Sequence, residues 1–149
     1  MSGRFLKYWL PLLLWMALIF TASTEAGSPL VSSFFLRPVL HWIDPTMSEH
    51  TFEIIHICCR KAAHLTEYAA LGFLALRMAR AQPPWNQKGT IYQLGVALFI
   101  CALYASTDEF HQSFVPTRHP AVTDVMIDTT GAAAGLAMTL VVERMRRPK

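Results

Sequence analysis

The chain has 149 residues, of which 53% are hydrophobic and only 15% are charged, and its formal net charge is +3. Soluble domains carry about 25% charged residues, so this composition, with its apolar residues gathered in long runs, excludes an ordinary soluble domain. The basic residues lie beside the apolar runs and form no separate arm, which argues against a nucleic-acid-binding protein.

Residues 5–22 are predicted to form the first membrane span. Arg4 and Lys7 lie at its start, and the span is roughly 18 residues long, near the lower limit for a helix that crosses a bilayer. The small residues T-A-S-T-E-A-G at its end would also suit cleavage of a signal peptide. We favour a retained helix, because a span here balances the topology of the later segments.

Residues 24–53 are predicted to form an extracytoplasmic loop. Pro29, Pro38 and Pro45 interrupt this stretch, which argues against one continuous helix. The aromatic and aliphatic residues between the prolines would allow a short amphipathic piece on the membrane surface. A loop packed over the helix bundle is the alternative.

Residues 54–79 are predicted to form the second span, and their outer half is unusually polar. At 100° per residue, Arg60, His64 and Glu67 fall on one stripe of the helix. Charged groups that face lipid are costly, so this stripe is expected to point into the bundle or into a polar crevice. Two further polar residues, Lys61 and Tyr68, lie on the shoulders of the stripe.

Residues 90–113 are predicted to form the third span, which ends in the polar sequence D-E-F-H-Q. The helix is expected to continue to about Phe114, before Pro116 stops it. Asp108 and Gln112 are then an i, i+4 pair, and His111 lies one turn from Asp108.

Residues 121–142 are predicted to form the fourth span. Asp124, Asp128, Gly131 and Gly135 recur at helical spacing and fall on a single stripe. The sequence G-A-A-A-G is a packing face of small residues, which lets a neighbouring backbone approach closely. We therefore expect both carboxylates of this stripe to face the bundle as well.

Together these segments predict an all-α integral membrane bundle of four transmembrane helices in a single domain. Nine of the thirteen basic residues fall on one side of this arrangement. By the positive-inside rule that side is the cytoplasm, and both termini lie there. The polar parts of spans two, three and four then converge at the extracytoplasmic end.

Three motifs in the chain resemble those of the VanZ-like family of small bacterial membrane proteins. They read R-K-A-A-H-L-T-E-Y-A-A-L-G, D-E-F-H-Q-S-F-V-P-T-R and D-V-M-I-D-T-T-G-A-A-A-G, in that order, and the resemblance covers roughly residues 60–143. It implies a location in the bacterial cytoplasmic membrane and a role in tolerance of teicoplanin-type glycopeptides. The chain departs from the family pattern at V-P-T-R, where Gly more often precedes the Arg, and at Asp128, where a neutral Asn is common.

The family pattern and the helical phase together define a predicted ligand-binding set at the outer end. His41, His50, His56 and His119 are left out, because histidines of this kind are more often interfacial surface residues than ligands. The predicted set consists of Arg60, Lys61, His64, Glu67, Tyr68, Asp108, Glu109, His111, Gln112, Arg118, Asp124 and Asp128.

The favoured interpretation of this set is a binding site without catalysis. Arg60, Lys61 and Arg118 would hold an anionic group such as a phosphate, which guanidinium groups grip with paired hydrogen bonds. The ligand could be an anionic membrane lipid, a lipid-linked cell-wall precursor or a glycopeptide drug. No cofactor and no nucleic-acid partner are expected.

Two alternatives remain open. In the first, the chain is an enzyme on a phospho-linked lipid, and carboxylates and imidazoles supply acid–base or metal chemistry. Against it, the sequence has no nucleophile elbow, no P-loop and no H-E-x-x-H motif. In the second, ion pairs such as Lys61–Asp124 and Arg118–Glu109 only lock the helices together. The candidate catalytic residues are His64, Glu67, Asp108, Glu109 and His111.

Overall fold

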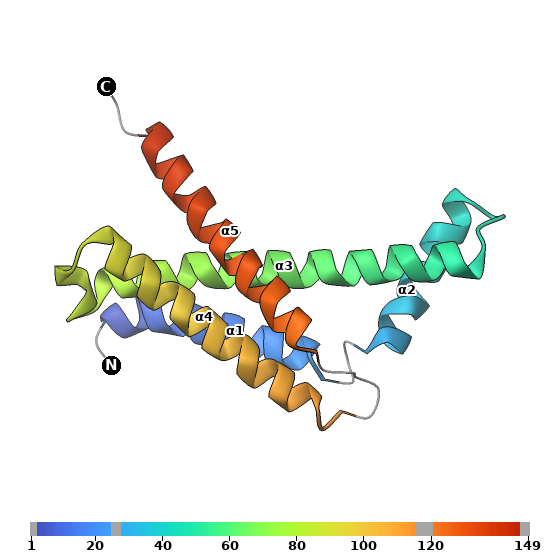
Figure 1. Cartoon of the computed structure of the whole chain (residues 1–149), viewed down its shortest axis with the longest axis horizontal. Helices are drawn as coiled ribbons and strands as arrows, with labels where there is room; N and C mark the ends of the chain where they lie inside the picture. The colour runs from blue at the N-terminus through green and yellow to red at the C-terminus, as the bar shows by residue number, and fades with distance from the viewer. Residues whose placement is uncertain (1–2, 25–27, 116–120, 147–149) are drawn as a thin grey trace.

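The computed structural model describes residues 3–24, 28–115 and 121–146, and all regular structure in these ranges is helical. A π-helical segment leads into the first helix, and a short 3-10 turn precedes the fourth (Figure 1). The elements are η1 (Phe5–Trp9), α1 (Leu10–Ala22), α2 (Pro29–Ile43), α3 (Glu49–Ala81), η3 (Trp85–Gln87), α4 (Thr90–Gln112) and α5 (Val122–Arg146).

Helix α3 is the axis around which the other helices pack. It has 33 residues, which at about 1.5 Å per residue gives about 50 Å, well over the hydrocarbon thickness of a bilayer. Helices α1, α4 and α5 pack along it, while α2 lies beside its N-terminal part (Figure 1). The N-terminal part of α3 thus carries a different neighbour from the rest of the helix.

Among the described residues, three stretches are long and apolar enough to cross a membrane: Phe5–Ala22, Thr90–Gln112 and Val122–Arg146. The predicted span at residues 54–79 is not among them, so the prediction of four such helices is corrected to three. The reason is its charge, since Arg60, Lys61, Glu67 and Arg77 all lie in that stretch. Because α3 packs against α1, α4 and α5, it does not need an apolar surface on every side.

The predicted loop at residues 24–53 is also corrected, because most of it is helical. Helix α2 runs without a break through Pro38. Pro29 stands in its first turn, where a missing N–H costs nothing, and the hydroxyl of Ser28 accepts a hydrogen bond from the Val31 amide at 3.4 Å. The cost of one internal proline is local, and contacts outside the helix outweigh it.

Two polar contacts supply part of that compensation by joining α2 to α3. Ser32 Oγ lies 2.8 Å from His56 Nε2, and the Arg37 guanidinium donates to Glu49 Oε1 at 2.6 Å. Glu49 opens α3 five residues before the predicted start at Ile54, and Ser48 caps it. The opposite face of α2 is exposed and apolar, as expected of an amphipathic piece.

Helices α3 and α5 meet at backbone contact through glycines. A Cβ added at Gly131 would lie 2.5 Å from the Leu65 carbonyl oxygen, and one at Gly72 would lie 2.7 Å from that of Ala132. A Cβ at Gly135 would overlap the backbone of Ala69. The small-residue face of α5 therefore holds the two helices close, and it leads toward the polar end of α5.

Helix α1 is tied to this pair and to α4 by two long-range hydrogen bonds. Trp15 Nε1 donates to the carbonyl of Glu67 at 2.9 Å, and the Tyr104 hydroxyl donates to the carbonyl of Met16 at 2.5 Å. These bonds fix α1 against α3 and α4, so its C-terminal end reaches the polar region described next.

Candidate functional site

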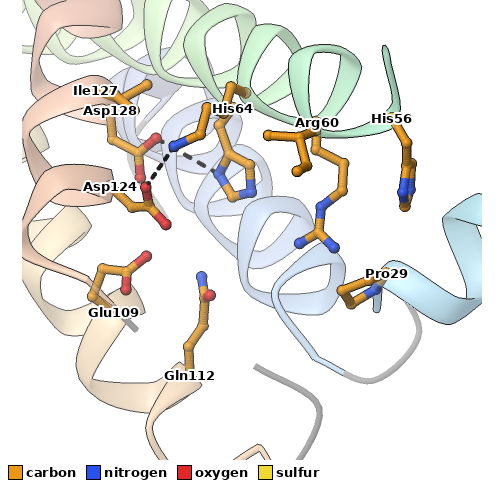
Figure 2. Close-up of a pocket in the computed structure, with 11 residues that line it drawn as sticks. Pro29, His56, Arg60, His64, Glu109, Gln112, Asp124, Ile127 and Asp128 are labelled. Atoms are coloured by element: carbon orange, nitrogen blue, oxygen red, sulfur yellow. Dashed lines mark hydrogen bonds and ion pairs between the residues drawn. The ribbon is translucent and has the colours of Figure 1, made fainter. Parts of the chain in front are cut away.

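A cavity of about 260 Å³ opens where the polar parts of α3, α4 and α5 meet, close to the start of α2 (Figure 2). Three apolar side chains complete its walls, and the rest of the lining is polar or ionisable. The lining residues are Pro29, His56, Ile57, Arg60, Lys61, His64, Glu109, Gln112, Asp124, Ile127 and Asp128.

The charges of the cavity are segregated by helix. Every basic or imidazole side chain of the lining comes from α3, and every carboxylate comes from α4 or α5. His56, Arg60 and His64 recur every four residues, so a single face of α3 presents them. Glu109 and Gln112 extend from α4 into the same space as Asp124, which the side chains of α3 face from the other side (Figure 2).

Two ion pairs join these walls, and they differ in burial. Lys61 Nζ lies 3.0 Å from Asp124 Oδ1, and both side chains remain about half exposed, at 50% and 40%. His64 Nδ1 lies 3.6 Å from Asp128 Oδ1, and the Asp128 side chain is only 1% exposed. Exposed pairs contribute about 0–1 kcal/mol, whereas a buried carboxylate depends strongly on its partners.

Next to the cavity, Asp108 is the centre of a buried hydrogen-bond network. The hydroxyl of Ser23 and the side-chain amide of Gln112 both donate to Asp108 Oδ2, at 2.7 and 3.1 Å. Ser23 lies at the end of α1, so the network connects α1 to α4. The predicted i, i+4 relation between Asp108 and Gln112 is therefore a hydrogen bond.

Four buried polar atoms have no hydrogen-bond partner among the described residues: Tyr68 Oη, Asp108 Oδ1, His111 Nδ1 and Asp128 Oδ2. Leaving such an atom unsatisfied costs about 1–3 kcal/mol. Native structures keep few of them, and each calls for a reason. Because Asp128 lines the cavity, a ligand with an N–H or O–H group would find an acceptor there.

Glu109 connects the end of α4 to the start of α5. It is 7% exposed, and its Oε2 accepts a hydrogen bond from the Ala121 amide at 3.0 Å. The predicted pair with Arg118 lies outside the described residues, as does Arg118 itself.

The structure brings most of the predicted set to one place. Arg60, Lys61, His64, Glu109, Gln112, Asp124 and Asp128 line the cavity, while Tyr68 and Asp108 are buried and do not line it.

Glu67 and His111 belong to the predicted set but lie apart from the cavity lining. The backbone carbonyl of Glu67 receives the Trp15 hydrogen bond. The His111 ring packs on Phe20 with 4.2 Å between centroids. Both residues thus have a contact with α1.

His56 is the main lining residue that sequence reasoning missed. It is 9% exposed and bonded to Ser32, so its placement on the interfacial surface was wrong. Burial, and then the positive charge of Arg60, lower the pKa of His56. The sequence did contain a signal for His56, because it lies four residues before Arg60 and therefore on the same helix face as Arg60 and His64. Ser23, which donates to Asp108 in the buried network, was also missed, and nothing in the sequence around it indicates that contact.

A metal centre receives no support from the geometry. Within residues 3–24, 28–115 and 121–146, no group of three or more His, Cys, Asp or Glu side chains is arranged to hold a metal ion.

Comparisons with known proteins assign the chain to a family. A sequence model of the VanZ/LLP1 family matches residues 8–143, which include the last two residues of η1, all of helices α1 to α4, and α5 up to Glu143. Neither curated proteins nor solved structures give a match. With three helices that could cross a bilayer, the family match indicates a membrane protein. The chain belongs to the VanZ/LLP1 family.

Proposed function

We propose that this protein binds the anionic headgroup of an envelope lipid or lipid-linked cell-wall precursor in the cavity between α3, α4 and α5. Susceptibility to teicoplanin-type glycopeptides would change as a consequence of that binding. The observation that carries the proposal is the cationic wall of α3, on which Arg60 and Lys61 line the cavity, flanked by the imidazoles of His56 and His64.

The cationic wall suits a phosphate group. Arg60 extends from α3 into the space beside Pro29 (Figure 2), and a guanidinium binds phosphate oxygens with paired hydrogen bonds. Lys61 is held by Asp124 in an exposed pair, which costs no more than about 1 kcal/mol to separate. Lys61 can therefore exchange this carboxylate for a ligand phosphate.

The acidic wall suits the rest of such a headgroup. Glu109, Asp124 and Asp128 offer acceptors to the hydroxyl or amino groups that envelope lipids and precursors carry beside their phosphates. The unpartnered Oδ2 of Asp128 is the acceptor with most to gain from such a donor. A ligand with an anionic group at one end and donors at the other fits both walls.

The size of the cavity favours a headgroup over a whole drug molecule. Pockets that enclose drug-sized ligands have volumes of about 300–1,000 Å³, and this one holds about 260 Å³. A glycopeptide is larger than an ordinary drug, so the cavity would admit a part of it at most. We therefore place the effect on glycopeptides downstream of lipid or precursor binding.

The proposed location is the extracytoplasmic side of the bacterial cytoplasmic membrane. Lys7, near the start of the first apolar segment, and Glu143, near the end of α5, line one cavity at the other end of the bundle. The N-terminal end of the first helical segment and the C-terminal end of α5 thus lie close to each other and away from the polar site. With the basic residues concentrated at that end, the positive-inside rule supports an outward-facing site.

The proposal is tested by complementing a deletion strain with variants. We expect Arg60→Gln to remain monodisperse in detergent and to lose the wild-type effect on lipid-linked precursor levels and teicoplanin susceptibility. Lys88→Gln removes one positive charge outside the cavity and should complement fully. Full complementation by Arg60→Gln would refute the proposal.

A lipid-modifying enzyme is the second candidate, favoured by the pairing of His64 with Asp128. A buried carboxylate beside an imidazole can orient that imidazole and stabilise its protonated form, which suits general acid–base catalysis. Incubation of the purified protein with a polyisoprenyl phosphate or pyrophosphate distinguishes the two candidates. Conversion of either lipid, lost in His64→Gln, would favour the enzyme, and binding without conversion favours the proposed function.

A further inference from the structure

A second cavity lies at the other end of the bundle, and the proposed function does not use it. It has a volume of about 470 Å³ and is formed by the start of the chain, the end of α3 and the end of α5. Arg80, on its wall, follows His64 by 16 residues of continuous helix, which separates the two cavities by about 24 Å along α3. It is therefore a distinct site.

The charge of this cavity is predominantly positive. Lys7, Arg77 and Arg80 line it, and Glu143 is its one carboxylate among the lining residues. Arg80 donates from both terminal nitrogens to the two carboxylate oxygens of Glu143. A guanidinium has five N–H donors, so Arg80 keeps donors beyond those that this pair uses.

Lys7 and Arg77 are held by an aromatic ring instead of a carboxylate. Lys7 Nζ lies 5.4 Å and the Arg77 Cζ atom 5.5 Å from the centroid of the Tyr8 ring. Both distances are within the range of a cation–π contact. Neither cation makes an ion pair within the described part of the chain. Two exposed cations are thus brought to one ring, where they repel each other unless an anion joins them.

The order of side chains along α3 matches the polarity of a phospholipid. Phe73 and Leu76 line the part of the cavity nearer the middle of the bundle, and Arg77 and Arg80 follow them toward its end. Phe73 is 46% exposed, so it offers apolar surface to a ligand. A free phosphate ion would have no use for this apolar wall, whereas the first carbons of an acyl chain would cover it.

From this arrangement we propose that the cavity binds an anionic phospholipid. The phosphate contacts Lys7, Arg77 and the remaining donors of Arg80, and the start of an acyl chain packs on the exposed ring of Phe73. Basic pockets between membrane helices on the cytoplasmic side are suited to anionic headgroups, and this end of the bundle is the predicted cytoplasmic end. The site would anchor η1, α3 and α5 to one lipid.

The test is a titration of the purified protein in non-ionic detergent with phosphatidylglycerol, followed by native mass spectrometry. We expect the double variant Lys7→Gln/Arg77→Gln to weaken one phosphatidylglycerol-binding event by about 25-fold, from about fivefold for each cation removed at a membrane surface. The matched control is Arg144→Gln/Arg146→Gln, which removes two charges from exposed positions of α5 outside the cavity and should leave that binding unchanged.

Further arms separate the possible sources of phosphate and the two cavities. Inorganic phosphate should not displace the lipid, and phosphatidylcholine should bind more weakly than phosphatidylglycerol. Arg60→Gln should keep the event that Lys7→Gln/Arg77→Gln loses, since Arg60 lies in the other cavity.

Equal losses in the two double variants, or displacement by inorganic phosphate, would overturn the proposal. If the double variant does not fold, Lys7→Gln alone, at an exposed residue, should weaken the event by about fivefold, and no effect in that variant would also count against the site.

Discussion

The two cavities of this protein share helix α3 but use charge in different ways. In the cavity near His64, groups of both signs face each other from different helices, and Asp128 is almost fully buried. In the cavity near Arg80, exposed cations surround a single carboxylate, and an aromatic ring holds two of them. Buried opposite charges require a fixed geometry, whereas exposed cations adapt to any nearby anion. The first arrangement therefore suits selective binding, and the second suits a bilayer lipid.

The largest expected effect comes from the glycine contact between α3 and α5, on which both cavities depend. Gly135→Val would place side-chain atoms into the backbone of Ala69. Overpacking a tight contact costs about 1–3 kcal/mol or more, and here the obstacle is backbone that cannot rotate away. We expect loss of monodisperse protein in size-exclusion chromatography.

The matched control for this prediction is Gly95→Ala on α4, where an added Cβ meets nothing within 4 Å. That variant should behave as wild type. A Gly135→Val protein that elutes and melts like wild type would show that α3 and α5 are further apart than described.

The buried network at Asp108 should be the next most sensitive feature. Ser23→Ala removes the donor of the 2.7 Å hydrogen bond to Asp108 Oδ2, and hydrogen bonds to charged groups contribute about 1.5–3 kcal/mol. The melting temperature should fall. Ser106→Ala is the control, because its exposed hydroxyl only contacts the carbonyl of Ala102 in its own helix. Equal melting temperatures for Ser23→Ala and wild type would contradict the role given to α1.

The exposed pair of the first cavity should matter for binding and hardly for stability. Asp124→Asn weakens a half-exposed contact with Lys61, so the free energy of unfolding should change by less than about 1 kcal/mol. Lys61→Gln should be equally stable but should weaken binding of a polyisoprenyl phosphate. If either variant lost several times that stability, the pair would be structural and the binding interpretation would lose support.

The smallest effect expected is a pattern of chemical labelling. Cys58 and Cys59 are exposed on the polar part of α3, and Cys101 is buried in α4. A membrane-impermeant maleimide added to intact cells or spheroplasts should label the first two and spare the third. Labelling only after the membrane is opened would place this end of the bundle on the cytoplasmic side.

Much of the first cavity follows from local helical geometry, which a sequence displays directly. Arg60 and His64, Asp108 and Gln112, and Asp124 and Asp128 are each four residues apart, so each pair lies on one face once the segment is helical. The glycine face of α5 could be predicted for the same reason, because Gly131 and Gly135 are also four residues apart.

Contacts between segments far apart in the chain could not be predicted from local sequence patterns. Ser23 and Asp108 are 85 positions apart, and nothing in either neighbourhood indicates the other. For the segment of α2, an amphipathic piece and a packed loop both stayed open, because Pro38 argues locally against a helix, while the contacts of Ser32 and Arg37 with α3 favour one. The count of apolar spans failed because α3 carries charged residues within the stretch 54–79, while it still packs against α1, α4 and α5.

The central claim is that the cationic wall of α3 binds an anionic headgroup, and a binding titration tests it most directly. Purified wild type and Arg60→Gln are titrated with polyisoprenyl phosphate and compared by native mass spectrometry. A charge-assisted contact of about 1.5–3 kcal/mol predicts a loss of at least about tenfold in affinity for the variant. Lys88→Gln should match the wild type. Equal affinities for wild type and Arg60→Gln would contradict the account.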